Sequence, residues 1–170
     1  NITYQMIPPS IGGFSKDLLL KVAELSCLAY TVSEVQESCQ GHLAEGYSVV
    51  PFFDKTPSHA GNVYFKGKEV IVSFRGTWNG SDVLSDLNSL LEIAPFLNNK
   101  GRVHSGFYHK FCESCYSIRE HILLYCKDRN IEFKDLDFII SGHRMGGAIA
   151  SIFALWFTQA NPQSNQDRTA

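Results

Sequence analysis

The chain has 170 residues, of which 44% are hydrophobic and 19% are charged. This length and composition are typical of one globular domain, so we expect residues 1–170 to form a single domain. The formal net charge of -2 comes without a basic cluster, which argues against a nucleic acid partner. The apolar runs are shorter than the ~20 residues of a membrane span, and the first residues do not form an intact secretory signal. We expect a soluble domain, and its compartment stays open.

Hydrophobic periodicity and turn residues divide the chain into helices and strands. Ser15 is suited to cap the first helix, and Pro51 indicates an edge strand because it cannot donate a backbone hydrogen bond. Two β-rich segments joined by a short turn should form a hairpin that leads into a buried strand. In chain order we predict a helix over 16–30, an edge strand over 47–53, the hairpin over 61–64 and 69–74, a short helix over 78–91, a long helix over 107–127, a strand over 136–140 and a helix over 148–157.

A glycine-framed turn joins the strand over 136–140 to the apolar helix that follows it. In the G-x-S-x-G nucleophile elbow, such a turn exposes a serine at its apex and places the next backbone N–H in an oxyanion hole. Here the same frame reads Gly142-His143-Arg144-Met145-Gly146, so arginine stands where the serine is expected. Taken alone, this spacing fits an ordinary glycine turn equally well.

Two companion motifs strengthen the interpretation. VSFRGT at 72–77, GxVHxGF at 101–107 and IISGHxxGGAxA at 139–150, in this order, resemble the class 3, fungal-type lipases of the α/β-hydrolase superfamily. The resemblance implies an α/β fold with a mixed sheet and helices on both faces, which would be truncated after the elbow helix. It also implies hydrolysis of carboxylic esters such as triacylglycerols through a serine nucleophile, with no metal or organic cofactor. The implied partner is a lipid or ester small molecule.

The resemblance also assigns roles to individual positions. Arg144 would occupy the nucleophile position, Thr77 would be the first oxyanion-hole residue, and Met145 would be the second through its backbone N–H. The elbow glycines would be Gly142, Gly146 and Gly147, and the lid candidates would be Trp78, Val83, Leu84 and Leu87. Such a lid would open at a membrane interface. The alternative for residues 78–91 is a helix that faces the core.

Arginine cannot perform the task of the serine. Its guanidinium group stays protonated at ordinary pH and has no lone pair that could attack a carbonyl. The α/β-hydrolase order places the acid and the histidine after the nucleophile, but only Asp167 and no histidine follow Arg144 in this sequence. Neither Ser141, at the strand end, nor His143 is placed to substitute. We therefore predict that the chain as given is catalytically inactive.

Two other interpretations stay open beside an inactivated lipase. The chain could be a non-catalytic lipase-like module that binds a lipid, an anion or a protein partner, with Arg144 and the following helix N-terminus holding a carboxylate or phosphate. It could also be an active lipase, if Arg144 is not native and the chain continues. The sequence does not predict an oligomeric state.

Three further features favour structural roles. His104 should be a hydrogen-bonded histidine that braces the turn over 101–107. Arg75 is expected in an ion pair at the strand end. The pair Cys112 and Cys115 lies within a predicted helix and lacks a second half-site, so we expect core or semi-buried thiols and no metal site.

Overall fold

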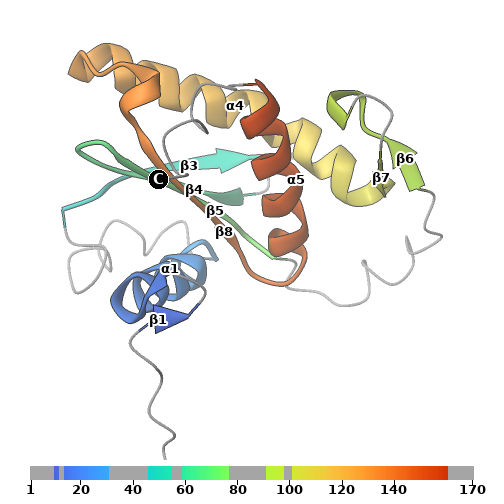
Figure 1. The fold of residues 1–170 in the computed structure, drawn as a ribbon, viewed down its shortest axis with the longest axis horizontal. Helices are drawn as coiled ribbons and strands as arrows, with labels where there is room; N and C mark the ends of the chain where they lie inside the picture. Colours follow the sequence, from blue (N-terminus) through green and yellow to red (C-terminus); the bar gives the residue numbers. More distant parts are fainter. Residues whose placement is uncertain are drawn as a thin grey trace, which may run out of the picture.

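A computed structural model describes residues 10–11, 14–30, 46–54, 59–76, 91–97 and 101–160. The helices are α1 (Lys16–Leu28), α4 (Ser105–Arg129) and α5 (Met145–Ala160), with short 3-10 turns η1 (Pro95–Leu97) and η2 (Phe133–Asp135). The strands are β1 (Ser10–Ile11), β2 (Phe14–Ser15), β3 (Ser48–Phe53), β4 (His59–Lys66), β5 (Glu69–Phe74), β6 (Leu91–Ile93), β7 (Arg102–His104) and β8 (Asp137–Gly142). Both helices and strands occur along these residues, with a run of strands between α1 and α4 (Figure 1).

The central sheet has the order β3-β4-β5-β8 and is mixed. β3, β4 and β5 pair antiparallel, whereas β5 and β8 run parallel, with Phe74 opposite Gly142 at their carboxyl ends. Pro51 lies in β3 at the edge of this sheet, where a missing backbone donor costs little. The expected hairpin forms with Gly67 in its turn at φ 58, a conformation that favours glycine. Parallel β5 and β8 bring the VSFRGT strand beside the predicted elbow.

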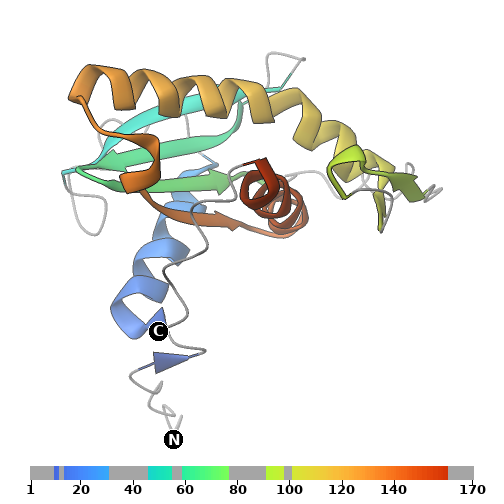
Figure 2. The same ribbon diagram turned by 45° about the horizontal axis from the view of Figure 1, so that its top comes forward.

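Helices cover both faces of the sheet, as predicted (Figures 1 and 2). One face packs against α4 and α5 through buried side chains that include Val70, Val72 and Phe74 of β5. The other face packs against α1, where Leu25 meets Tyr64 and Ile71. Alternate residues of β5 therefore point to opposite layers, and its near-continuous apolar sequence follows from burial on both sides.

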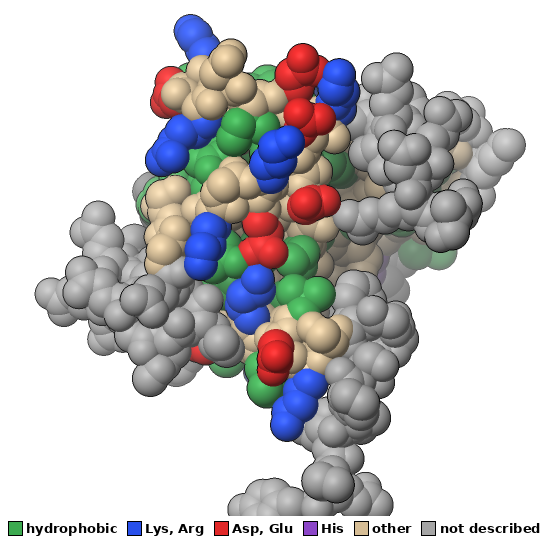
Figure 3. All heavy atoms as spheres, turned by 60° about the vertical axis from the view of Figure 1, so that its left-hand side comes forward, with side chains coloured by type: hydrophobic (Ala, Val, Ile, Leu, Met, Phe, Trp, Pro, Cys, Tyr) green, Lys and Arg blue, Asp and Glu red, His purple; other side chains and the backbone are tan. Residues whose placement is uncertain are grey.

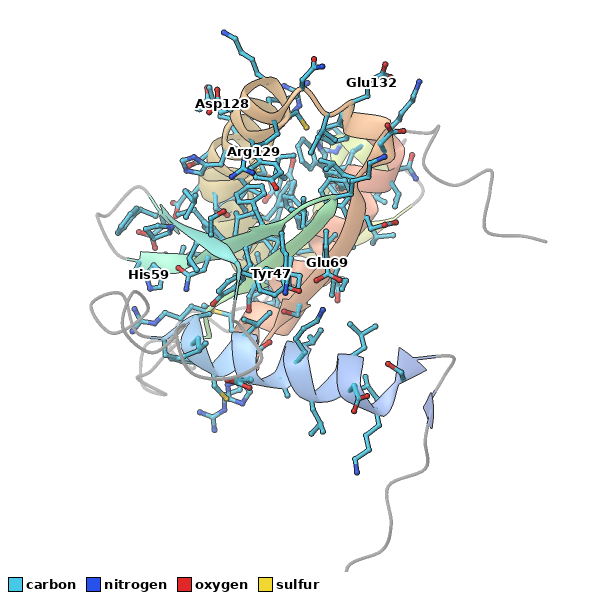
Figure 4. The ribbon with its side chains drawn as sticks, turned by 90° about the vertical axis from the view of Figure 1, so that its left-hand side faces the viewer. Tyr47, His59, Glu69, Asp128, Arg129 and Glu132 are labelled. Carbon is cyan, nitrogen blue, oxygen red and sulfur yellow. The ribbon has the colours of Figure 1, made fainter. Side chains whose placement is uncertain are left out.

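Polar side chains tie α1 to the sheet. The ammonium group of Lys21 lies 2.8 Å from a carboxylate oxygen of Glu69 and 2.9 Å from the hydroxyl of Tyr47, which also donates to Glu69. Tyr47 and Glu69 lie on the side of the sheet that faces α1 (Figure 4). Burial alone would raise the pKa of Glu69, but the hydrogen bonds from Lys21 and Tyr47 outweigh it and lower the pKa overall.

This cluster predicts a pH-dependent contribution to stability. Because the folded state lowers the pKa of Glu69, the contribution is present above the unfolded pKa of about 4.3 and is lost as the pH falls through the folded value. Glu69→Gln should therefore lower the free energy of unfolding by about 1 kcal/mol at neutral pH and by much less in acid. Urea unfolding of both proteins at neutral and acid pH measures the difference, and a constant gap would contradict the prediction.

Two expectations on residues 78–91 have different outcomes. Leu91, the last residue of the predicted short helix, begins strand β6 instead, where it pairs with His104. The helix prediction is wrong at this residue, because a cross-strand partner distant in sequence decides its conformation. The rest of that helix, residues 78–90, lies outside the described residues. That residues 1–170 form a single domain stays a prediction.

The remaining predicted helices and strands are present with small changes at their ends. α4 begins two residues earlier than predicted and ends at Arg129, followed by Asn130 in the left-handed conformation of a helix C-cap. Within the described residues, none of the helices is long and apolar enough to cross a membrane. Basic and acidic side chains are intermixed on the face in Figure 3, in keeping with the small net charge.

Candidate functional site: the turn between β8 and α5

The turn between β8 and α5 has the geometry of a nucleophile elbow. β8 ends at Gly142, α5 begins at Met145, and two residues join them. Arg144 has φ 55, the left-handed region that residues with side chains rarely adopt. The amide of Gly146 donates to the carbonyl of His143 at 2.9 Å, and that of Gly147 donates to Arg144 at 3.0 Å, so helical turns begin at once. Arginine thus occupies the apex of a sharp strand-to-helix turn.

The glycine frame is required by backbone contacts on both sides of the turn. A Cβ atom on Gly142 would lie 2.2 Å from the carbonyl oxygen of Gly146. One on Gly146 would lie 2.4 Å from the carbonyl oxygen of Phe74, and one on Gly76 would lie 2.5 Å from that of His143. The end of β5 is therefore pressed against the elbow, which explains why the two motifs contain glycine.

The backbone conformation of Arg144 should cost stability. A left-handed non-glycine residue is unfavourable, and a cation at the start of α5 opposes the helix dipole. Arg144→Gly should therefore raise the free energy of unfolding by about 1 kcal/mol, after the added entropy of the unfolded chain is subtracted. Asn130→Gly is the matched control at φ 53 and should change stability less, because asparagine tolerates this region. Equal gains at both positions in urea unfolding would contradict the argument.

The side chains beside Arg144 turn toward α1 or the sheet. Nδ1 of His143 forms a hydrogen bond with the hydroxyl of Tyr30, and the two atoms are 2.8 Å apart. The hydroxyl of Ser141 accepts a hydrogen bond from Ser26 of α1 at 3.2 Å, so it points away from the elbow apex. Met145 packs its side chain against the core between the sheet, α4 and α5. Ser141 and His143 therefore each contact a side chain on α1 or just after its end.

A cavity of about 730 Å³ opens between the elbow and α1. Its lining is mainly apolar and combines Gly142, His143 and Arg144 with four residues of α1 and its C-terminal end, namely Ala23, Ser26, Cys27 and Tyr30. The volume is within the range of small-molecule pockets. Arg144 is exposed, and among the described residues no ion pair or hydrogen bond of its guanidinium group is found.

Several predicted site residues lie outside the described residues. These are Thr77, the expected first oxyanion donor, and the lid candidates Trp78, Val83, Leu84 and Leu87. Gly76, which immediately precedes Thr77, lies against both the carbonyl of His143 and the hydroxyl of Tyr30. The chain therefore leaves the end of β5 close to the elbow, and the role of Thr77 stays a prediction.

Two structural roles differ from those expected. The ring of His104 stacks on Phe107 with 4.5 Å between centroids, but within the described ranges neither of its buried nitrogens has a hydrogen-bond partner. The prediction of a hydrogen-bonded brace is wrong for this part of the chain. Arg75 donates to the carbonyl of His59 at 3.3 Å and lies over the ring of Tyr30, so its contacts here are not the expected ion pair. The guanidinium group of Arg75 contacts a backbone carbonyl and an aromatic ring instead of a carboxylate.

The prediction of core or semi-buried thiols is confirmed for Cys115 and wrong for Cys112, which is exposed on α4. Cys115 is buried, and its burial together with neighbouring Cys112 raises its pKa to about 11. It is therefore a neutral thiol at physiological pH and a poor nucleophile. Among the residues described, no three His, Cys, Asp or Glu side chains converge in a way that could hold a metal ion.

Sequence reasoning did not name Tyr30 or Cys27 as part of the site. Both residues lie at the end of α1, which is separated from the elbow by more than a hundred residues. Only their packing on β8 brings them together, through contacts such as Tyr30 with His143. The sequence shows an aromatic residue, Tyr30, at the end of α1, but it does not show that Tyr30 contacts His143.

Comparisons with known proteins agree with this geometry. A family model described as Lipase (class 3) matches residues 71–170. Secreted mono- and diacylglycerol lipase 1 of Fusarium solani is 30% identical over 89 residues, which are 52% of this chain and 25% of that protein. The native propeptide complex of Rhizomucor miehei lipase matches with a TM-score of 0.67 and 20% identity over 86% of this chain and 48% of its own. A lipase from Rhizopus microsporus var. chinensis matches with a TM-score of 0.65 and 20% identity, over 86% and 52%.

These comparisons confirm the expected α/β fold and the resemblance to class 3 lipases. The chain spans about half the length of the solved lipases and a quarter of the Fusarium protein. At such low identity the solved structures show the shared α/β-hydrolase-type fold alone. The family model matches more than half of the chain and includes most of β5 and all of β8, the elbow and α5. The chain therefore belongs to the class 3 lipase family.

Proposed function

We propose that this chain is a class 3 lipase module that does not hydrolyse esters and whose elbow serves to bind a lipid or an anion. The family reaction would be hydrolysis of carboxylic esters in lipids, and the name of the Fusarium relative points to acylglycerols as the ester class. The observation that carries the proposal is Arg144 at the left-handed apex of the elbow. A guanidinium group there cannot form the acyl intermediate.

The elbow retains only part of the groups that ester cleavage requires. Ester cleavage needs a nucleophile oxygen, a base that takes its proton, and N–H donors that stabilise the oxyanion. The backbone N–H of Met145 is suited to the last task, and Thr77 is proposed to assist it. His143 is engaged by Tyr30. A frame for the oxyanion without a nucleophile is suited to binding.

Hydrolysis of p-nitrophenyl butyrate by the purified protein tests this proposal. The expected rate equals that of the buffer, because loss of the nucleophile alone removes a factor of about 10⁶ in kcat. A fluorophosphonate probe should likewise leave no adduct on residues 142–146, as read by peptide mass spectrometry. Hydrolysis above buffer, together with an adduct at the elbow, would overturn the proposal. A longer gene product with a downstream Asp and His and with Arg144→Ser would show whether the fold supports turnover.

The same proposal covers the lid and the interface. If residues 78–91 form the family's lid, this chain should contact a lipid surface there. Apolar side chains exposed beside that segment, Leu91 and Ile93 of β6, would add to such a contact. The alternative of an active lipase requires serine at position 144 in the native gene, so sequencing that codon from genomic DNA separates the two readings.

A further inference from the structure

The cavity between α1 and the elbow combines an apolar wall with one cation. Ala23 and Cys27 are one helical turn apart on α1 and form part of the wall, while Arg144 stands at the elbow side. Within the described residues no carboxylate lines this space, and Arg144 has no ion pair there. An apolar cavity with an unmatched guanidinium group is complementary to an amphiphile with an anionic head.

We propose that this cavity binds a long-chain fatty acid, with its carboxylate on Arg144 and its alkyl chain along α1. A guanidinium fork matches the two oxygens of a carboxylate, and burial of CH₂ groups against Ala23 and Tyr30 adds affinity along the chain. The proposal rests on the proposed function in one respect, namely that the elbow holds its ligand and does not cleave it.

The lining distinguishes this ligand from other anions. Inorganic phosphate and acetate could meet Arg144, but they would leave the apolar wall exposed to water. A neutral lipid such as dodecanol could cover the wall, but it would leave the guanidinium group without a counter-charge. Only a ligand with both parts uses both features of the cavity, so dodecanoate below its micelle concentration is the suitable probe.

Calorimetric titration of the purified chain with dodecanoate is the primary measurement. We expect saturable binding that is weakened about tenfold or more by Arg144→Gln and less by Arg144→Lys. Arg129→Gln is the matched control, since Arg129 lies at the end of α4 far from α1 (Figure 4) and should leave the affinity unchanged. Ala23→Trp should abolish binding by filling the cavity, and this helix position is exposed, so the fold tolerates the change.

Cys27 supplies a reporter within the same protein. Both Cys27 and Cys112 are exposed, but only Cys27 lines the cavity. Bound dodecanoate should slow alkylation of Cys27 by N-ethylmaleimide about tenfold and leave Cys112 unchanged, as followed by peptide mass spectrometry. Dodecanol, acetate and phosphate should give neither saturable binding nor protection.

Four results would overturn the inference. These are no binding of dodecanoate, equal affinity in Arg144→Gln, binding without protection of Cys27, and phosphate binding as tight as that of dodecanoate. The last result would mean that the alkyl chain contributes nothing. Failure here is separate from failure of the proposed function, which the p-nitrophenyl butyrate and fluorophosphonate assays detect independently of any bound fatty acid.

Discussion

Gly142→Ala should lower the free energy of unfolding by about 3 kcal/mol, at the upper end of overpacking effects. The added Cβ would meet the carbonyl oxygen of Gly146 at 2.2 Å and the amide nitrogen of Gly147 at 2.7 Å. Both are backbone atoms, so no side chain can rotate away. Relief requires β8 and α5 to separate, which would also open the contact between Gly146 and Phe74. Urea unfolding followed by circular dichroism measures the loss.

Gly147→Ala is the control one helical turn away from the strand end. Its Cβ would lie 3.2 Å from the carbonyl oxygen of Gly142, a contact that a shift of a few tenths of an ångström relieves. Alanine also favours the helix by about 1 kcal/mol over glycine. The two terms oppose each other, so the net change should be small. A loss at Gly147 equal to that at Gly142 would mean that general helix packing, and not the elbow frame, is the cause.

The sequence predicted the elbow because its signals are local. An apolar strand, glycines at fixed offsets and an apolar helix lie within about twenty residues, and each signal reports the local backbone. The structure has the same elements, with Arg144 at the apex. The two-sided sheet was also predictable, since a strand such as β5 with consecutive apolar residues must be covered on both faces.

The cavity and the partners of His104 were not predictable, for a physical reason. Tyr30 meets His143 only because α1 packs across β8, and sequence spacing contains no information on that crossing. Leu91 adopts a strand because His104 pairs with it, although its own neighbours suggest a helix. Such long-range pairs override local preference where a segment is short and exposed.

Phe153→Ala should have the largest effect, a loss of about 4 kcal/mol from the free energy of unfolding. Phe153 is fully buried on α5, and its ring packs against Phe74, Phe111 and Phe157 with centroids 5.5, 6.4 and 5.6 Å away. It therefore joins α5 to the end of β5 and to α4. Removing the ring leaves a cavity that these rigid neighbours cannot fill. A denaturant titration measures this loss, which is a large share of a typical stability of 5–15 kcal/mol.

Leu155→Ala tests whether this effect depends on position. Leu155 lies on the same helix but is 47% exposed, so its truncation should cost less than about 1 kcal/mol. Similar losses at both positions would mean that α5 is not held by the aromatic layer. Because α5 begins at the elbow, loosening this layer should also move Met145 and Arg144 relative to β5. Fatty-acid affinity in a folded Phe153→Leu variant should then fall even though residue 153 does not line the cavity.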